Sequence, residues 1–134
     1  LQDWPVAPAA WTDAALAAEF DQLLKLRAKA TETLEPLRQA GAIGKSLDAT
    51  LAIAAAPDDA VLAFLEKHRD FLPEFFIVSA VAMEPKSVPS LEGSARRAQD
   101  SGESRCPRCW RWVPQLQSTP HGEVCPRCAE ALNS

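Results

Sequence analysis

The chain has 134 residues, of which 47% are hydrophobic and 24% charged, and its formal net charge is −4 at pH 7. This length suits one ordinary domain, or a small domain with a smaller appendage, and the hydrophobic fraction is normal for a globular protein. No stretch approaches the roughly 18 consecutive apolar residues of a membrane-spanning helix, so we expect no membrane segment.

Charge is distributed unevenly along the chain. Residues 1–85 carry 7 Lys/Arg and 13 Asp/Glu, whereas residues 86–134 carry 7 and 5. An anionic partner, above all a nucleic acid, is therefore expected near the C-terminal part. The sequence begins at Leu1 without an initiator Met and without the basic and apolar regions of a secretory signal. We expect a piece of a longer, cytoplasmic protein.

Residues 12–40 are predicted to form a long amphipathic helix. Thr12 offers an N-cap hydroxyl, and Gly41 ends the helix. Pro36 lacks a backbone N–H and predicts a kink or an early stop near Glu35. The apolar side chains recur in steps of three and four, as one helix face requires: Leu16, Phe20, Leu23, Leu26, Ala30, Leu34 and Leu37.

A small strand–helix–strand unit is predicted next. Residues 46–54 alternate apolar and polar side chains, which indicates a strand with one buried face. A Pro-Asp-Asp sequence at residues 57–59 opens a second predicted helix over roughly residues 58–70. Residues 75–83 are rich in β-formers with little polarity, so we expect a strand covered on both sides. The short connections favour a βαβ unit with parallel strands.

The predicted fold class is α+β, in three parts. Residues 1–83 hold the long helix and the small α/β unit. Residues 84–104 are rich in Pro, Gly, Ser and charged side chains without periodicity, and we expect a flexible linker. Residues 105–134 are expected to form a zinc finger or ribbon that ends in a short helical turn.

The four cysteines of the chain lie in this last part as two Cys-Pro-Arg-Cys pairs with fifteen residues between them. Two CxxC pairs at such a distance are typical of a structural zinc site with four thiolate ligands. Four thiolates close the tetrahedron and leave no position for a catalytic water, so we expect one structural ion. The predicted ligands are Cys106, Cys109, Cys125 and Cys128.

Other uses of the cysteines fit less well. Two disulfides are expected in small secreted modules, but the upstream hundred residues contain no cysteine and no secretory signal. A thioredoxin-like redox motif needs one CxxC pair after a strand of a βαβ unit, not two copies. His121 is a weak competing ligand, because the four thiols already fill the coordination shell.

No catalytic residues are predicted in this chain. Gly44-Lys45-Ser46 resembles the end of a phosphate-binding P-loop, but Gln39 stands where that motif needs glycine. His68 is expected to be a surface or half-buried residue of a short helix. The serines have no evident base beside them.

Two segments carry a family pattern. Residues 23–49 place an arginine, a Leu-Glu pair and a second arginine before Ile-Gly-Lys-Ser-Leu-Asp-Ala. Residues 102–110 read Gly-Glu-Ser-Arg-Cys-Pro-Arg-Cys-Trp, and residues 125–128 repeat Cys-Pro-Arg-Cys. Together they resemble the C-terminal end of bacterial isoleucyl-tRNA synthetases, a family of class I aminoacyl-tRNA synthetases. The departures are small: Asp48 replaces the commoner Glu, and Arg105 replaces Lys.

The resemblance implies part of a multidomain enzyme that charges tRNA(Ile) with isoleucine. The family's ATP-binding signatures are not found in these residues, so ATP and magnesium are expected only in a catalytic domain outside this chain. The segment would bind the anticodon region of tRNA(Ile) and contact the remainder of the synthetase chain. We expect a cytoplasmic monomer with no membrane partner.

Arginines beside tryptophans are the candidate RNA contacts, because they can bind phosphates and stack on unpaired bases. If residues 110–112 form a strand, the two tryptophans share one face and the arginine between them points away. Either tryptophan can instead be the apolar core of the finger. Two helix arginines lie three turns apart on one face and either follow RNA or pair with carboxylates. The candidates are Arg108, Trp110, Arg111, Trp112, Arg27 and Arg38.

Two further classes of function are compatible with the sequence. A stand-alone zinc-ribbon protein that binds nucleic acid would be expected to be clearly basic, whereas the sequence pI is about 5.2. A protein-interaction or structural module would dock on other parts of a longer chain.

Overall fold

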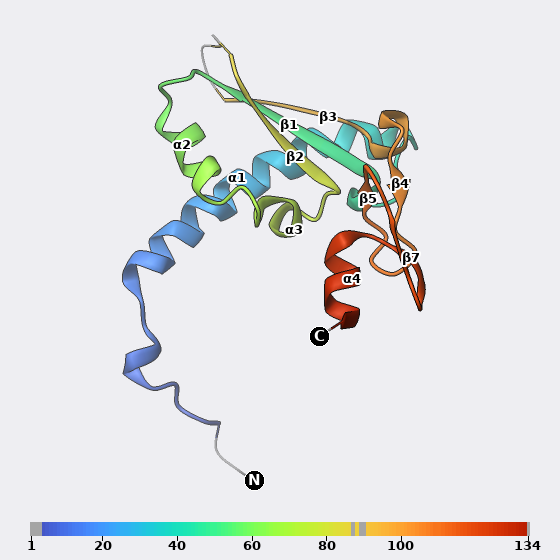
Figure 1. Ribbon diagram of the computed structural model, residues 1–134. Coiled ribbons are helices and arrows are strands. Elements are labelled where there is room, and N and C mark those ends of the chain that lie inside the picture. The colour runs from blue at the N-terminus through green and yellow to red at the C-terminus, as the bar shows by residue number, and fades with distance from the viewer. Residues whose placement is uncertain (1–3, 87, 89–90, 134) are drawn as a thin grey trace.

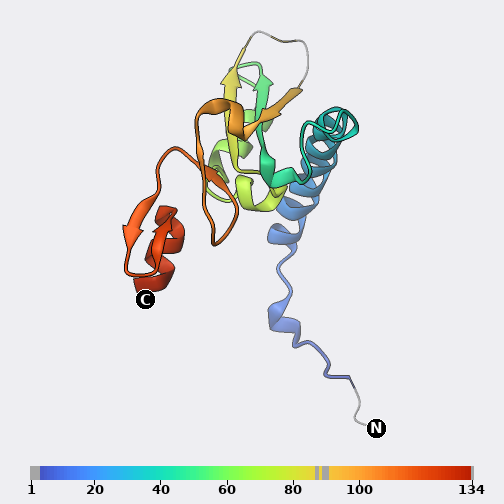
Figure 2. The same ribbon diagram turned by 90° about the vertical axis from the view of Figure 1, so that its right-hand side faces the viewer.

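The computed structural model describes residues 4–86, 88 and 91–133 (Figure 1). A long helix, α1 (Ala14–Gln39), precedes a three-stranded sheet of order β2-β1-β3. Helices α2 (Ala60–Lys67) and α3 (Leu72–Phe76) connect the first two strands. Figure 2 shows α1 along one side of the sheet, with the small C-terminal module on the other side. The α+β class predicted from the sequence is confirmed.

Helix α1 follows the predicted apolar pattern, but its buried stripe begins only at Leu23, because Leu16 and Phe20 are exposed. Asp13 caps it, since its carboxylate accepts a hydrogen bond from the Leu16 N–H at 2.9 Å, so the predicted Thr12 cap is wrong. The helix continues through Pro36 to Gln39, so of the two outcomes predicted for Pro36, a kink or an early stop near Glu35, the early stop is wrong. The buried stripe comprises Leu23, Leu26, Ala30 and Leu34.

Strand β1 (Ala49–Ala55) is the central strand of the sheet. It pairs in parallel with β2 (Ala80–Pro85), which confirms the predicted βαβ arrangement. Its residues are buried on both faces, where one buried face was predicted. Leu51 and Ile53 join the core that the sheet shares with α1, α2 and α3, whereas Thr50 and Ala52 alternate to the opposite face.

The predicted strand over residues 75–83 is partly wrong. Residues 72–76 form α3, and β2 begins only at Ala80. Pro73 lies in the first turn of α3, where its fixed φ suits a helix, and Ile77 ends the helix with a left-handed φ of 59°. Strand β2 is a half-buried edge strand rather than one covered on both sides.

The segment predicted as a flexible linker contains the third strand. Strand β3 (Glu92–Arg97) pairs antiparallel with β1 along its length, and a 3-10 turn, η3 (Ala98–Ser101), follows it. The expectation that residues 84–104 lack regular structure is therefore wrong. A strand of Gly, Ser and Arg at a sheet edge has no hydrophobic alternation, because its polar side chains face solvent.

Among the residues that the structure describes, no helix combines the length and hydropathy needed to cross a lipid bilayer.

Gly93 permits the close approach of β3 to α1. A Cβ added there would lie 2.5 Å from the Thr33 hydroxyl oxygen. We therefore expect Gly93→Ala to lower the free energy of unfolding by about 1–3 kcal/mol in urea titrations. The matched control is Gly44→Ala, because the nearest atom to that added Cβ is 3.8 Å away. Thr33→Ala in the same chain should restore most of the loss, and equal stability of both glycine variants would contradict the proposed packing.

Candidate functional site

The C-terminal module, residues 104–133, is built from short strands and one helix. Strand β4 (Ser104–Arg105) pairs with β5 (Trp112–Val113), and β6 (Gln117–Thr119) pairs with β7 (Gly122–Val124). Helix α4 (Pro126–Asn133) follows. The first CxxC pair lies in the turn between β4 and β5, and the second lies at the start of α4. This arrangement brings both pairs to one point.

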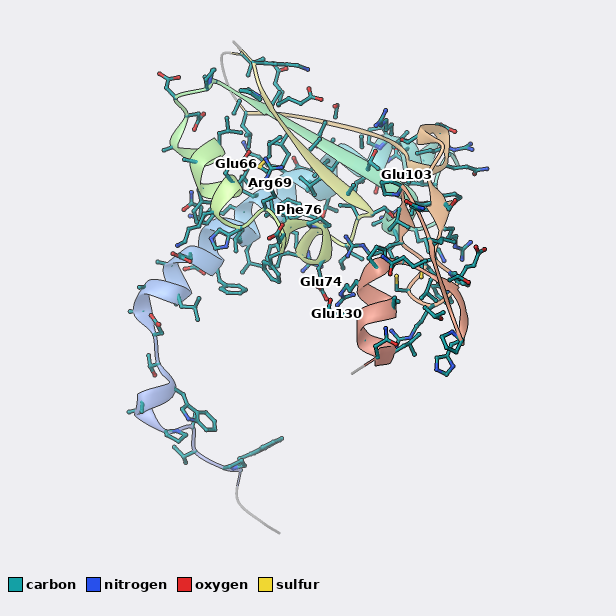
Figure 3. The ribbon with its side chains drawn as sticks, in the orientation of Figure 1. Glu66, Arg69, Glu74, Phe76, Glu103 and Glu130 are labelled. Atoms are coloured by element: carbon teal, nitrogen blue, oxygen red, sulfur yellow. The ribbon has the colours of Figure 1, made fainter. Side chains whose placement is uncertain are left out.

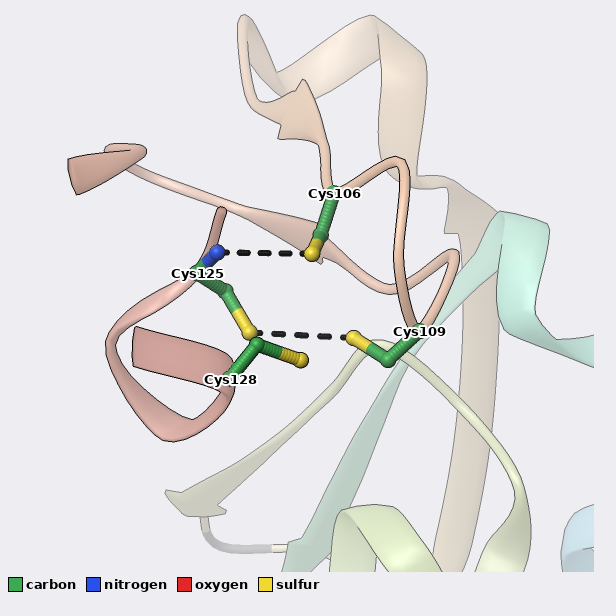
Figure 4. Close-up of side chains that lie close together, drawn as sticks. All are labelled: Cys106, Cys109, Cys125 and Cys128. Carbon is green, nitrogen blue, oxygen red and sulfur yellow. Dashed lines mark hydrogen bonds between the residues drawn. The ribbon is translucent and has the colours of Figure 1, made fainter. Parts of the chain in front are cut away.

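The sulfur atoms of the four cysteines all lie within 4.8 Å of one another (Figure 4). The shortest hydrogen-bonded pair, Cys109 and Cys125, has a sulfur–sulfur distance of 3.6 Å. This is far longer than the ~2.05 Å of a disulfide and close to the ~3.8 Å between two thiolates of a tetrahedral site. The four residues therefore fit a metal ion and do not fit disulfides.

Hydrogen bonds and burial act differently on the individual thiols. Burial raises the pKa of Cys106, but backbone N–H groups around its sulfur outweigh burial and lower that pKa to about 6. Burial and the neighbouring sulfurs raise the pKa of Cys109 to about 12, and burial also raises the pKa of Cys125. Four thiolates at such short distances repel one another, so a bound cation would favour their joint ionisation.

Arg108 and Trp110 lie on the exposed side of the first CxxC turn. The neighbouring Cys128 sulfur raises the pKa of the Arg108 guanidinium. Trp110 is 50% exposed and adopts a left-handed φ of 66°, and its N–H donates to the Cys106 carbonyl at 2.9 Å. The CxxC turn therefore fixes the backbone of Trp110 while its indole stays accessible to solvent.

Arg111 and Trp112 instead lie at the junction between the module and the sheet. The Trp112 N–H donates to the Ser79 hydroxyl at 2.7 Å, and its indole N–H donates to an Asp48 carboxylate oxygen at 3.4 Å. Arg111 donates to the Ser79 carbonyl at 3.2 Å. The condition for the predicted alternation is not met, because β5 begins only at Trp112, and Arg111 contacts the same residue as Trp112.

Ser79 and Asp48 are site residues that sequence analysis missed. Ser79 is 4% exposed, and its hydroxyl also donates to the Leu47 carbonyl at 2.6 Å. A second connection joins the module to the α/β unit, where Arg127 of α4 pairs with Glu74 of α3 at 2.9 Å. Figure 3 shows Glu74 on the side of α3 that faces α4. A single serine between two elements gives no pattern in the sequence, so only the structure shows its role.

The two helix arginines have different surroundings. The Arg27 guanidinium lies 5.5 Å from the centre of the Phe75 ring. Arg38 pairs with Glu35 at 3.5 Å and donates to the Ser46 hydroxyl at 3.1 Å, near the module. The structure thus brings Arg38, but not Arg27, close to the other candidates.

The two histidines lie apart from the cysteine cluster. His68 is half-buried, as predicted, and lies 3.6 Å from a Glu19 carboxylate oxygen. His121 is exposed and is not part of the group of possible metal ligands that the described residues form.

Comparison with known proteins identifies the relatives of this chain. No family model matches it. An isoleucine–tRNA ligase from Thermotoga petrophila is 36% identical over 134 residues, which cover 96% of this chain and 14% of that protein. The isoleucine–tRNA ligase of Syntrophotalea carbinolica is 36% identical over 134 residues, covering 93% of this chain and 14% of that protein. The enzyme of that name from Xylella fastidiosa is 37% identical over 113 residues, or 84% of this chain and 12% of that protein.

The chain is homologous to one segment of the isoleucine–tRNA ligases. The resemblance stated from the two sequence segments is confirmed. The chain spans about one seventh of the length of the first two relatives, since each match covers 14% of the longer protein.

Removing the Ser79 hydroxyl should loosen the junction, because the Trp112 N–H and the Leu47 carbonyl would lose their partner. We expect Ser79→Ala to lower the free energy of unfolding by about 1–3 kcal/mol. The control Ser118→Ala removes an exposed hydroxyl of β6 and should change stability little. Hydrogen exchange should also show faster exchange of the Trp112 amide in Ser79→Ala, and unchanged protection of that amide would count against this junction.

Proposed function

We propose that this chain is the C-terminal tRNA-binding segment of an isoleucine–tRNA ligase, in which it holds one structural zinc ion and no catalytic centre. The observation that carries the proposal is the solvent exposure of Arg108 and Trp110, which lie at the CxxC turn held by the four-cysteine cluster. The homology over 96% of the chain supports it. The whole enzyme would charge tRNA(Ile) with isoleucine in the cytoplasm as a monomer, with ATP and magnesium bound in its catalytic domain.

Zinc is the metal that the donor set favours. Four thiolate ligands in a tetrahedron are typical of structural Zn²⁺, with Zn–S distances of about 2.3 Å, and iron is the main alternative for such a site. Three of the four ligands, Cys106, Cys125 and Cys128, are at most 3% exposed, so solvent has little access to the ion. A shielded site with four protein ligands stabilises the module and has no open position for a reaction.

Protein purified without added metal should contain about one zinc ion per chain, and Cys106→Ser should reduce this content. His121→Ala is the control, because the structure leaves His121 outside the cluster, and it should keep its zinc. Elemental analysis and thiol titration measure both quantities. Iron in place of zinc, or two disulfides without metal, would contradict the proposed centre.

Chelation should unfold the C-terminal module and leave the three-stranded sheet folded. The physical reason is that the cysteine cluster and the core of the α/β unit are separate groups of buried side chains. Hydrogen exchange with and without a chelator would locate the unfolded residues. Loss of protection throughout β1 would show that the two parts fold as one unit.

RNA binding is proposed for the exposed side of the module. The indole of Trp110 can stack on an unpaired anticodon base, and Arg108 can contact a phosphate or a base edge. Arg111 and Trp112 would support this surface from the junction, and Arg38 would extend it along the end of α1. Arg27, which lies against Phe75, would contribute least.

In the full synthetase, Trp110→Ala should weaken tRNA binding by about 1–3 kcal/mol, the usual contribution of one base–aromatic stack. Arg108→Ala should also weaken binding and reduce its salt dependence. Amino-acid activation, measured by ATP–pyrophosphate exchange, should not change, because that step takes place in another domain. The control Arg69→Ala removes a guanidinium that is paired with Glu66 on α2.

Zinc content must remain intact in these variants, since loss of zinc would unfold the module and mimic a binding defect. Normal charging of tRNA by both variants would show that the module is a scaffold and not an RNA contact. The same experiment separates the proposal from a protein-interaction module, which would leave tRNA affinity unaffected.

A further inference from the structure

Lys45 lies against the exposed tryptophan, although it belongs to a different part of the fold. It precedes the 3-10 turn η2 (Ser46–Asp48) between α1 and β1. Its ammonium lies over the Trp110 ring, 4.2 Å from the ring centre. Arg105 of β4 is the second cation near this ring, with its guanidinium carbon 5.9 Å from the centre. The indole is thus flanked by one cation from the α/β unit and one from the module.

The position of Lys45 relative to Trp110 is held by Asp48. One carboxylate oxygen of Asp48 accepts the Lys45 N–H at 3.2 Å, and the other accepts the Trp112 indole N–H at 3.4 Å. Arg38 donates to the hydroxyl of Ser46, the residue after Lys45, at 3.1 Å. Asp48 therefore ties the turn to the module beside the Lys45–Trp110 contact, and Arg38 ties the same turn to α1.

Two cations from different parts of the fold converge on the Trp110 ring, and neither has a carboxylate partner among the described residues. Within residues 4–86, 88 and 91–133, Lys45, Arg105 and Arg108 form no ion pair. Six of the other eleven Lys and Arg residues, all within the described part of the chain, are paired, as Lys67 is with Glu19, and five are not. Arg108 lies beside the Cys128 sulfur, whereas Lys45 and Arg105 approach the same ring, so their charges repel each other and attract an anion.

We propose that Lys45, Trp110 and Arg105 form one composite binding site for an unpaired nucleotide of the RNA. The base stacks on the indole, and its phosphate is bound by Lys45 and Arg105. The ammonium of Lys45 is on a flexible stem, so it can move from the ring to a neighbouring phosphate when a base stacks. This inference rests on the proposed tRNA-binding function. It adds Lys45, which lies outside the C-terminal module, to the proposed RNA contacts.

The site exists only while the module is docked on the α/β unit. Trp110 and Arg105 come from the module, whereas Lys45 comes from the turn after α1. RNA affinity therefore depends on the junction made by Ser79 and Asp48 as well as on the metal cluster.

The test uses the full synthetase and isoleucine-accepting tRNA, with the dissociation constant measured over a range of salt concentrations. Lys45→Met keeps the apolar stem and removes the charge. We expect it to weaken binding about three- to tenfold and to reduce the salt slope by about 0.7–0.9, as the loss of one phosphate contact requires. Lys45→Arg should retain most of the affinity. The control Lys67→Met removes a lysine that is paired with Glu19 and should change neither quantity.

A double-mutant cycle between Lys45 and Trp110 completes the test. The double variant Lys45→Met/Trp110→Ala should weaken binding by less than the product of the two single effects, because both residues hold the same nucleotide. If Trp110→Ala weakens binding while Lys45→Met changes neither affinity nor salt slope, the composite site is wrong and the proposed function stands. If Lys45→Met weakens binding without changing the salt slope, Lys45 only positions the ring, which also overturns the inference. Normal binding by both single variants would overturn the proposed function itself.

Discussion

The convergence of four cysteine sulfurs is the constraint on which the C-terminal module depends. Apart from the cysteines, the buried residues of this cluster are Val124 and Ala129, which is too little apolar surface to fold some thirty residues alone. The turn that carries Trp110 begins at Cys106 and includes Cys109. Whatever holds the sulfurs together therefore also fixes the backbone that carries the exposed indole, so the proposed metal ion would act on the proposed RNA contact through the backbone.

A second constraint joins this module to the rest of the chain. Ser79, the residue before β2, accepts a hydrogen bond from the backbone of Trp112, and Asp48 accepts hydrogen bonds from the Trp112 indole and the Lys45 backbone. The turn after α1 and the CxxC turn are thus neighbours in space, although more than sixty residues separate Lys45 from Trp110. These are the same two segments that carry the family pattern in the sequence. Their proximity gives that pattern a physical explanation as two halves of one surface.

Sequence analysis predicted the features that depend on local pattern. Helix α1 has a continuous apolar stripe, β1 and β2 are joined by a short helix, and the CxxC spacing is specific for four metal ligands. It failed for segments whose secondary structure is determined by tertiary contacts. The run Phe75-Phe76-Ile77-Val78 favours a strand by composition, but Phe76 and Val78 reach the core from a short helix and its left-handed end. Strand β3 has a polar sequence without hydrophobic alternation. It forms because it pairs with β1 and because Gly93 allows its backbone to pack closely against Thr33.

The roles of the two tryptophans could not be separated by sequence either, because both follow the first CxxC pair within three residues. In the structure the left-handed φ of Trp110 turns the chain, so that one indole is exposed and the other is bound at the junction. The proposed function depends on this difference. Residues such as Ser79 and Lys45 leave no signal in a single sequence, since their significance comes from partners far along the chain.

Ultraviolet cross-linking of isoleucine-accepting tRNA to the full synthetase, followed by mass spectrometry of the protein–RNA adducts, tests the central claim most directly. An indole stacked on an unpaired base is favourably placed for a zero-length cross-link. The account predicts that anticodon-loop nucleotides become attached to the peptide that contains Trp110, and that removal of zinc abolishes this adduct. Efficient cross-links that all lie outside residues 104–133 would contradict the account.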